Sequence, residues 1–152
     1  MGLIDDLGSG PVALDTSVFI YFIEQHSDWY PLVAPIFAGI DAGRCRAVTS
    51  SVTLLEVLVV PLRAGNGVLA SRYESLLTRS KGLSMVELDR EVIKVAAQLR
   101  AKFAVRTPDA LQLAAGLSAS ATAFVTNDRV LPSLPGMPVV QLGSYASSHS
   151  KR

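Results

Sequence analysis

Short apolar runs alternate with helical patterns along this chain, and the alternation is the strongest constraint on its fold. Nearly all-apolar strands must be buried on both faces, which implies a parallel sheet with helices on each side. The sequence therefore predicts an α/β fold, a three-layer α/β/α sandwich around a short central parallel sheet. The runs that we expect to form its strands are residues 12–15, 46–50, 83–88, 123–126 and 138–142.

The length and composition indicate one domain. A chain of 152 residues with 49% hydrophobic and 18% charged residues can bury one core and is too apolar to be disordered. We expect this domain to span residues 12–142, after an N-terminal extension at 1–11. The segment 143–152 is poor in apolar residues and is predicted to be a flexible tail.

Several features favour a cytoplasmic location without membrane association. Asp5 and Asp6 stand where a secretion signal would be basic, and the longest apolar runs are far too short to cross a bilayer. The single cysteine, Cys45, forms no internal disulfide and suits a reducing compartment.

The formal net charge of +1 gives the molecule no strong positive field of the kind that many nucleic-acid binders have. Basic side chains could still form a rim around an acidic pocket, although most of them are expected to lie on solvated helix faces. The candidates are Arg63, Arg72, Arg79, Lys81, Arg100, Lys102 and Arg106.

Four of the 13 acidic residues occupy unusual positions. Asp15 ends the first strand, Asp128 follows the fourth, Asp109 opens a helix and Glu56 lies inside an apolar helix. Each has a structural explanation when judged singly. Asp109 would gain about 0.3–1 kcal/mol from a helix N-terminus, Asp15 and Asp128 suit caps and turns, and Glu56 could point to water.

Glu56 is the most informative of these acids. Its neighbours at three and four residues include no Lys or Arg, so nothing on its own helix is placed to pair with it. A buried carboxylate must then reach solvent, take a proton, pair with a distant cation or bind a metal ion.

Together the four acids predict a metal site, because strand ends and helix starts face the same edge of a parallel sheet. Clustered carboxylates need a cation, and hard oxygen ligands favour Mg²⁺ or Mn²⁺ over zinc. Ser17 and Thr126 flank the acids and could bond to a carboxylate or a bound water. The two histidines, His26 and His149, are isolated and are expected at the surface.

The chemistry expected of such a site is phosphodiester hydrolysis, in which a metal ion activates water and stabilises charge on the phosphate. The sequence has no nucleophile with an adjacent base, and no Gly-rich phosphate loop or dinucleotide fingerprint.

The ordered motifs resemble those of the PIN domain family, in particular the VapC-type toxins of bacterial toxin–antitoxin pairs. The segment ALDTSVFIYFIE carries Asp15 in the place of the first family acid, and SSVTLLEVLVVPLRAG carries Glu56 in the second. RTPDALQLAAGL supplies Asp109, and AFVTNDRVL supplies Asp128, with Thr126 as its polar partner. The likeness runs from about Val12 to Leu142.

This resemblance implies that the chain is an Mg²⁺- or Mn²⁺-dependent endoribonuclease and the toxin of a type II pair. It also implies an RNA substrate, a homodimer and inhibition by a small antitoxin that covers or disrupts the site. Related alternatives are a non-toxin PIN nuclease in RNA processing and a non-catalytic PIN-like scaffold, the latter disfavoured by the intact acids.

Two unrelated classes fit less well. A haloacid-dehalogenase-type phosphatase needs a second Asp two residues after the first, where this chain has Ser17. A phospho-acceptor receiver domain, which is a binding module with an acidic pocket, needs an acid pair at the end of the first strand. Here Asp5 and Asp6 precede that strand.

Overall fold

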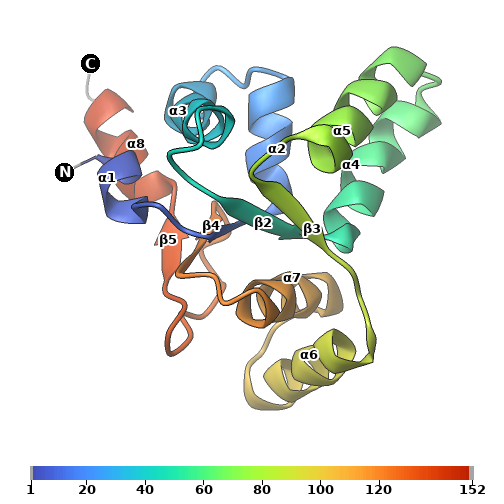
Figure 1. Cartoon of the computed structure of the whole chain (residues 1–152), viewed down its shortest axis with the longest axis vertical. Coiled ribbons are helices and arrows are strands. Elements are labelled where there is room, and N and C mark those ends of the chain that lie inside the picture. Colours follow the sequence, from blue (N-terminus) through green and yellow to red (C-terminus); the bar gives the residue numbers. More distant parts are fainter. Residues whose placement is uncertain (1, 151–152) are drawn as a thin grey trace.

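Five parallel strands form the centre of the molecule in the order β3-β2-β1-β4-β5. The computed structural model describes residues 2–150, with side chains described up to residue 146 (Figure 1). The chain builds the sheet outward from β1 in one direction and then returns to add β4 on its other side. The strands are β1 (Val12–Leu14), β2 (Ala47–Ser50), β3 (Leu83–Val86), β4 (Ala123–Thr126) and β5 (Val139–Gln141).

Helices cover both faces of this sheet, which confirms the predicted three-layer α/β/α sandwich. In Figure 1, α6 and α7 lie below the sheet and the other helices lie above it or at its ends. The helices are α1 (Leu3–Leu7), α2 (Thr16–Ile23), α3 (Tyr30–Asp41), α4 (Ser51–Arg63), α5 (Gly67–Arg79), α6 (Arg90–Lys102), α7 (Thr107–Ser118) and α8 (Gly143–Ser150). Across residues 2–150, none of them is long and apolar enough to span a bilayer.

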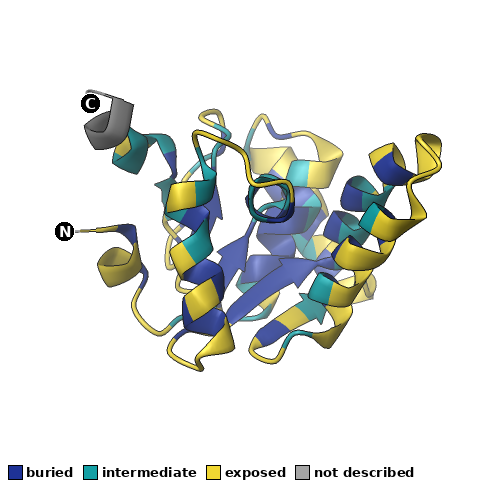
Figure 2. Ribbon diagram, turned by 90° about the horizontal axis from the view of Figure 1, so that it is seen from above, coloured by how far each residue is buried: buried dark blue, intermediate teal, exposed yellow. Residues whose placement is uncertain are grey.

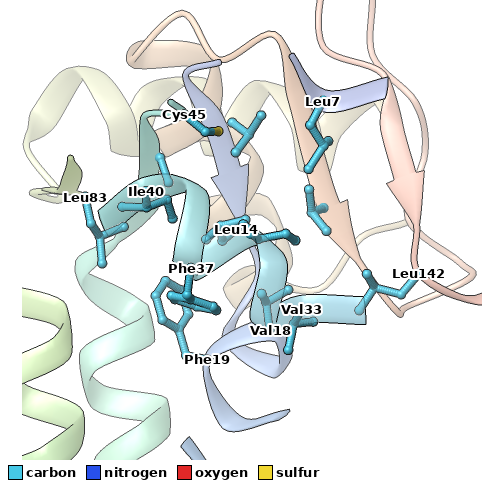
Figure 3. Packing of buried hydrophobic residues seen from close by; sticks show 14 of the residues in the cluster. Leu7, Leu14, Val18, Phe19, Val33, Phe37, Ile40, Cys45, Leu83 and Leu142 are labelled. Carbon is cyan, nitrogen blue, oxygen red and sulfur yellow. The ribbon is translucent and has the colours of Figure 1, made fainter. Parts of the chain in front are cut away.

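The strands divide the core into two parts because neighbouring residues of a strand point to opposite faces. Leu14 packs with Phe19 and Phe37 on the side of α2 and α3 (Figure 3). Ala13 packs on the other side with Leu113 of α7. Strands β1, β2 and β4 are buried along their whole length, and exposed residues lie on the outer helices and the loops (Figure 2). This explains why their sequences are almost continuously apolar.

Two terminal segments differ from the expected arrangement. Most of the segment predicted to be a flexible tail forms α8, and α1 lies within the N-terminal extension. Tyr145 packs against the core and donates a hydrogen bond to Asp6, which joins α8 to α1. The low apolar content of the tail concealed this one aromatic anchor. The side chain of His149 lies outside the described part of the chain.

Candidate active site

Asp15 stands at the carboxyl end of β1 and forms the N-cap of α2. Its Oδ1 accepts a 2.8 Å hydrogen bond from the N–H of Thr16, and its Oδ2 accepts a 2.6 Å hydrogen bond from the hydroxyl of Thr126. The backbone N–H of Asp15 is bonded to the carbonyl of Val125 in β4. The two central strands therefore fix this carboxylate at the point where the order of strands reverses, which is where sites form in open α/β sheets.

The environment of Asp15 is unfavourable to its negative charge. Burial raises the pKa of Asp15 above its ordinary value, and the charges of Asp109 and Glu56 raise it further, against the lowering effect of the bonds from Thr126 and Thr16. Asp15 is therefore a half-buried acid whose pKa two other site carboxylates raise directly.

Asp109 lies in the first turn of α7, as its third residue and not the second as predicted, because the helix already begins at Thr107. Burial raises the pKa of Asp109, and the charges of Asp128 and Glu56 add to this effect. The guanidinium of Arg106, whose Nε lies 3.7 Å from Oδ2 of Asp109, lowers the pKa of Asp109. The Arg106 side chain is 84% exposed, so this ion pair is weak and well screened.

Glu56 is held by residues from two other helices. Its Oε1 accepts a 2.6 Å hydrogen bond from the hydroxyl of Thr16 in α2 and lies 3.5 Å from Nε2 of Gln112 in α7. Among the described residues no Lys or Arg forms an ion pair with it. The sequence left a distant cation open as a partner for Glu56, and its neutral donors could not be identified from α4 alone.

Asp128 forms the turn that follows β4. Its Oδ1 accepts a 3.0 Å hydrogen bond from the N–H of Val130, and its own N–H donates to the hydroxyl of Thr126 over 3.0 Å. The carbonyl of Asp128 accepts a 2.8 Å bond from Gln141 in β5. The turn explanation is therefore correct for Asp128, but its charge also acts on Asp109.

Ser17, in the first turn of α2, has a buried hydroxyl oxygen for which no described residue supplies a hydrogen-bond partner. Buried polar atoms are nearly always paired, so such an atom next to Asp15 points to a contact with a bound molecule. Of the two residues predicted to support the acids, Thr126 donates a hydrogen bond to Asp15, whereas the hydroxyl of Ser17 has no hydrogen-bond partner among the described residues.

Apart from Thr126, the neutral polar residues that surround the acids were not predicted from the sequence. All five buried polar side chains among the described residues lie at or next to the ends of β2 and β4 or on the helices packed there. Helix periodicity is a signal that could have found two of them, because one is three residues from Glu56 and another three residues from Asp109. The five are Thr49, Ser50, Thr53, Gln112 and Thr126.

The candidate basic rim is dispersed. Arg106 contacts a site acid, while Arg100 donates to Val105 and Thr107 and so holds the loop before α7. Arg79 and Lys81 line a cavity of about 700 Å³ between α2, α3 and α5. Among the described residues, Arg106 is the one member of this set that forms an ion pair with a site acid.

The four acids interact electrostatically without forming a closed ligand group. Within residues 2–150, no three His, Cys, Asp or Glu side chains make a group that could hold a metal ion as they stand. Hydroxyl and amide donors occupy oxygens of Asp15, Glu56 and Asp128, and like charges favour separation. The donor chemistry nevertheless fits a hard divalent cation, which would lower the raised pKa values and could engage the unpaired Ser17 hydroxyl.

Comparison with protein families gives one match, in which the sequence model described as PIN domain covers residues 12–136. This range contains all four candidate acids. No curated protein matches the chain by sequence.

Solved structures with a similar fold include chains of three toxin–antitoxin assemblies. A toxin–antitoxin complex from Klebsiella pneumoniae has a TM-score of 0.65 at 17% identity, covering 86% of this chain and 97% of the matched one. VapBC2 from Rickettsia felis, bound to a promoter DNA fragment, has a TM-score of 0.65 at 18% identity with the same coverage. DNA-bound VapBC from Salmonella typhimurium has a TM-score of 0.61 at 21% identity, again covering 86% and 97%.

Proposed function

Because this chain belongs to the PIN domain family, we propose that it is a metal-dependent nuclease whose site is formed by Asp15, Glu56, Asp109 and Asp128. The observation that carries the proposal is the mutual effect of these carboxylates, since burial and like charge raise the pKa of both Asp15 and Asp109. Keeping such acids together at a sheet edge costs stability, and a bound cation offsets that cost.

Asp15, Glu56 and Asp109 are proposed to hold the essential ion, Mg²⁺ or Mn²⁺, and Asp128 to complete the site or hold a second ion or a water. The ion would supply Lewis-acid chemistry at a phosphodiester. Thr126 orients Asp15 through its 2.6 Å hydrogen bond. Ser17 offers its buried hydroxyl to the phosphate or to an ordered water.

The proposed substrate is RNA, cut internally, and the proposed biological role is that of a toxin in the cytoplasm. The similar folds found in the Klebsiella, Rickettsia and Salmonella toxin–antitoxin assemblies support this role. Arg63 lies seven residues after Glu56 on the same face of α4, about 10 Å along the helix axis. We propose that it contacts an RNA phosphate next to the one at the metal site.

A small antitoxin is the proposed partner, and an exposed apolar stripe on α4 supports it. Leu55, Val59 and Leu62 lie on one face of α4, with exposed fractions of 65%, 39% and 64%. Exposed apolar surface of this kind marks protein contacts. The stripe adjoins Glu56, so a protein segment with an apolar face seated there would cover the carboxylate edge. We also propose that the chain forms a homodimer, which light scattering of the purified protein would test.

The direct test compares cleavage of mixed RNA by wild type with Mg²⁺, wild type with a chelator, and Asp15→Asn with Mg²⁺. We expect full cleavage only in the first case, no cleavage with the chelator, and cleavage about 100-fold slower in the variant. Glu91→Gln, which alters an exposed acid on α6, is the matched control and should cleave as wild type does. Equal cleavage under all conditions would rule out the metal-nuclease mechanism.

Expression in growing cells tests the toxin role separately. Growth arrest that is relieved by a small protein encoded beside the gene is the expected result. Cleavage in vitro without any effect on growth would instead favour an RNA-processing nuclease. Loss of co-purification in Leu55→Lys/Leu62→Lys, but not in Ile93→Lys on α6, would support the α4 stripe as the antitoxin surface.

A further inference from the structure

Gln112 lies at the centre of a buried polar network that joins three helices beneath the carboxylates. Its side chain on α7 is 3% exposed. Nε2 lies 2.7 Å from the hydroxyl of Thr53 in α4, 2.9 Å from that of Thr16 in α2, and 3.5 Å from Oε1 of Glu56. Full burial of an amide is costly without partners, so its position requires explanation.

The direction of each hydrogen bond on the Thr53 side of this network follows from counting hydrogens. Thr49 donates its only hydroxyl hydrogen to the carbonyl of Leu14 over 2.9 Å. In the 2.8 Å contact between Thr49 and Thr53, Thr53 must therefore be the donor. Thr53 has then used its hydrogen and can only accept from Gln112.

The same count applies on the other side. Thr16 donates its hydroxyl hydrogen to Glu56 over 2.6 Å, so it too can only accept from Gln112. The two amide hydrogens of Gln112 thus serve Thr53 and Thr16, and the 3.3 Å contact between those two hydroxyls has no hydrogen left to share. A carboxylate or apolar group in place of the amide would leave both threonines without a donor.

We propose that Gln112 is a positioning residue for the metal site, and this inference rests on the proposed nuclease function. By donating to Thr16, Gln112 aims the Thr16 hydroxyl at Oε1 of Glu56 and so fixes the rotamer of that carboxylate. No described residue hydrogen-bonds Oε2 of Glu56, so the second oxygen stays available for a cation. Gln112 acts through Thr16 and Glu56 and does not itself touch the reacting atoms.

The test compares Gln112→Met, which keeps the length and bulk of the side chain but has no donor, with wild type. The Kd for Mn²⁺ is measured from the electron paramagnetic resonance signal of free Mn²⁺, in the absence of RNA. Residues that orient metal ligands typically contribute about 10- to 100-fold to metal affinity. We expect Mn²⁺ binding to weaken by this factor, and RNA cleavage to lose kcat with little change in KM.

Tyr73→Phe provides the matched control. The Tyr73 hydroxyl donates to Glu24 and also joins α2 to another helix, but at the opposite end of α2, about 12 Å along its axis from Thr16. Each variant removes the hydrogen-bonding group of one buried side chain, so a purely structural role would lower thermal stability in both and cause no specific loss of Mn²⁺ binding. We expect Tyr73→Phe to retain the wild-type Kd for Mn²⁺.

A second pair of variants, at a half-buried position, covers the case in which Gln112→Met does not fold. Thr16→Val removes the hydroxyl that contacts Glu56 and should weaken Mn²⁺ binding by the same factor, whereas Thr16→Ser restores the hydroxyl and should restore the affinity. Wild-type affinity for Mn²⁺ in folded Gln112→Met, or in Thr16→Val where Gln112→Met does not fold, would overturn the role of Gln112 but not the proposed function. Failure of the wild-type protein to bind Mn²⁺ would overturn this inference together with the proposed function.

Discussion

The hydroxyl of Thr126 donates a 2.6 Å hydrogen bond to Oδ2 of Asp15, linking the carboxyl ends of the two strands at the centre of the sheet. The hydroxyl oxygen of Thr126 also accepts a 3.0 Å hydrogen bond from the N–H of Asp128. One buried side chain thus fixes a carboxylate and the turn that carries another. Thr126 is fully buried, so no water can replace either bond.

Replacing Thr126 by Val should therefore damage both stability and function. The variant keeps the shape of the side chain but leaves the Asp15 carboxylate and the Asp128 N–H each short of a partner, at a cost of about 1–3 kcal/mol. Loss of the bond from Thr126 also raises the pKa of Asp15 further. Urea unfolding measures the first effect and RNA cleavage the second. Thr126→Ser should retain most of both, and a Thr126→Val protein equal to wild type would contradict this role.

Asp109→Asn should stabilise the metal-free protein at neutral pH. The pKa of Asp109 is raised above its ordinary value of 3.8 in the folded state, so between that value and the raised pKa the folded protein binds more protons than the unfolded chain. Stability is therefore lost as the pH rises through this window. Removing the charge should raise Tm by about 2–4 °C for each kcal/mol relieved.

Thermal unfolding with a chelator, followed from pH 4 to pH 7, measures this difference. The Tm advantage of Asp109→Asn should grow with pH and then level off. Saturating Mg²⁺ should reverse the order of the two proteins, because only wild type gains the full binding energy of the ion. An advantage that is constant across the pH range would contradict the raised pKa.

Metal binding should release protons on the acid side of neutrality. Asp15 and Asp109 both have raised pKa values and must be ionised to hold a cation, so at a pH above about 4 the ion displaces the protons that remain on them. Calorimetric titration with Mn²⁺ in two buffers of different ionisation enthalpy gives the number released. Identical heats in the two buffers at acidic pH would show that the acids are already fully ionised.

Gly116→Ala should displace the helix that carries Asp109. A Cβ at Gly116 would lie 2.8 Å from Sδ of Met137 and 3.1 Å from Cβ of Ala13, and both residues are buried. Overpacking of this kind costs about 1–3 kcal/mol, and a shift of α7 away from the sheet should also weaken Mn²⁺ binding. Gly67→Ala is the control, since its Cβ meets nothing within 4 Å. It should be neutral or stabilising by up to about 1 kcal/mol in urea unfolding.

The fold was predictable because local patterns dominate it. The buried strands have few polar residues, and helices begin at good caps such as Asp89, whose carboxylate bonds to the N–H of Val92. The third strand was predicted to reach Leu88 but ends at Val86, where the chain turns toward that cap. Boundaries of this kind depend on side-chain capping and are the least certain part of a sequence pattern.

The acids of the site could be proposed from the sequence because each stands at a strand end, at a helix start, or without a partner on its helix. Apart from Ser17 and Thr126, which flank the acids in the sequence, their supporting residues could not. The bonds from Gln112 to Thr16 and Thr53 join segments far apart in the chain, and helix periodicity alone does not reveal which helices meet. The α8 helix escaped prediction for a similar reason, since its link to α1 through Tyr145 and Asp6 is a tertiary contact.

Because β4 pairs with β1, the proposed site can be completed only after the C-terminal part of the chain has been synthesised. Asp15 leaves the ribosome early, but its partner Thr126 and the turn at Asp128 are synthesised more than a hundred residues later. At roughly 5–20 residues per second this interval lasts roughly 6–20 seconds. Until β4 is synthesised, β1 lacks its neighbour on that side, so the proposed site at Asp15 and Asp128 is incomplete on the nascent chain. The proposed antitoxin has that interval in which to fold before the site is complete.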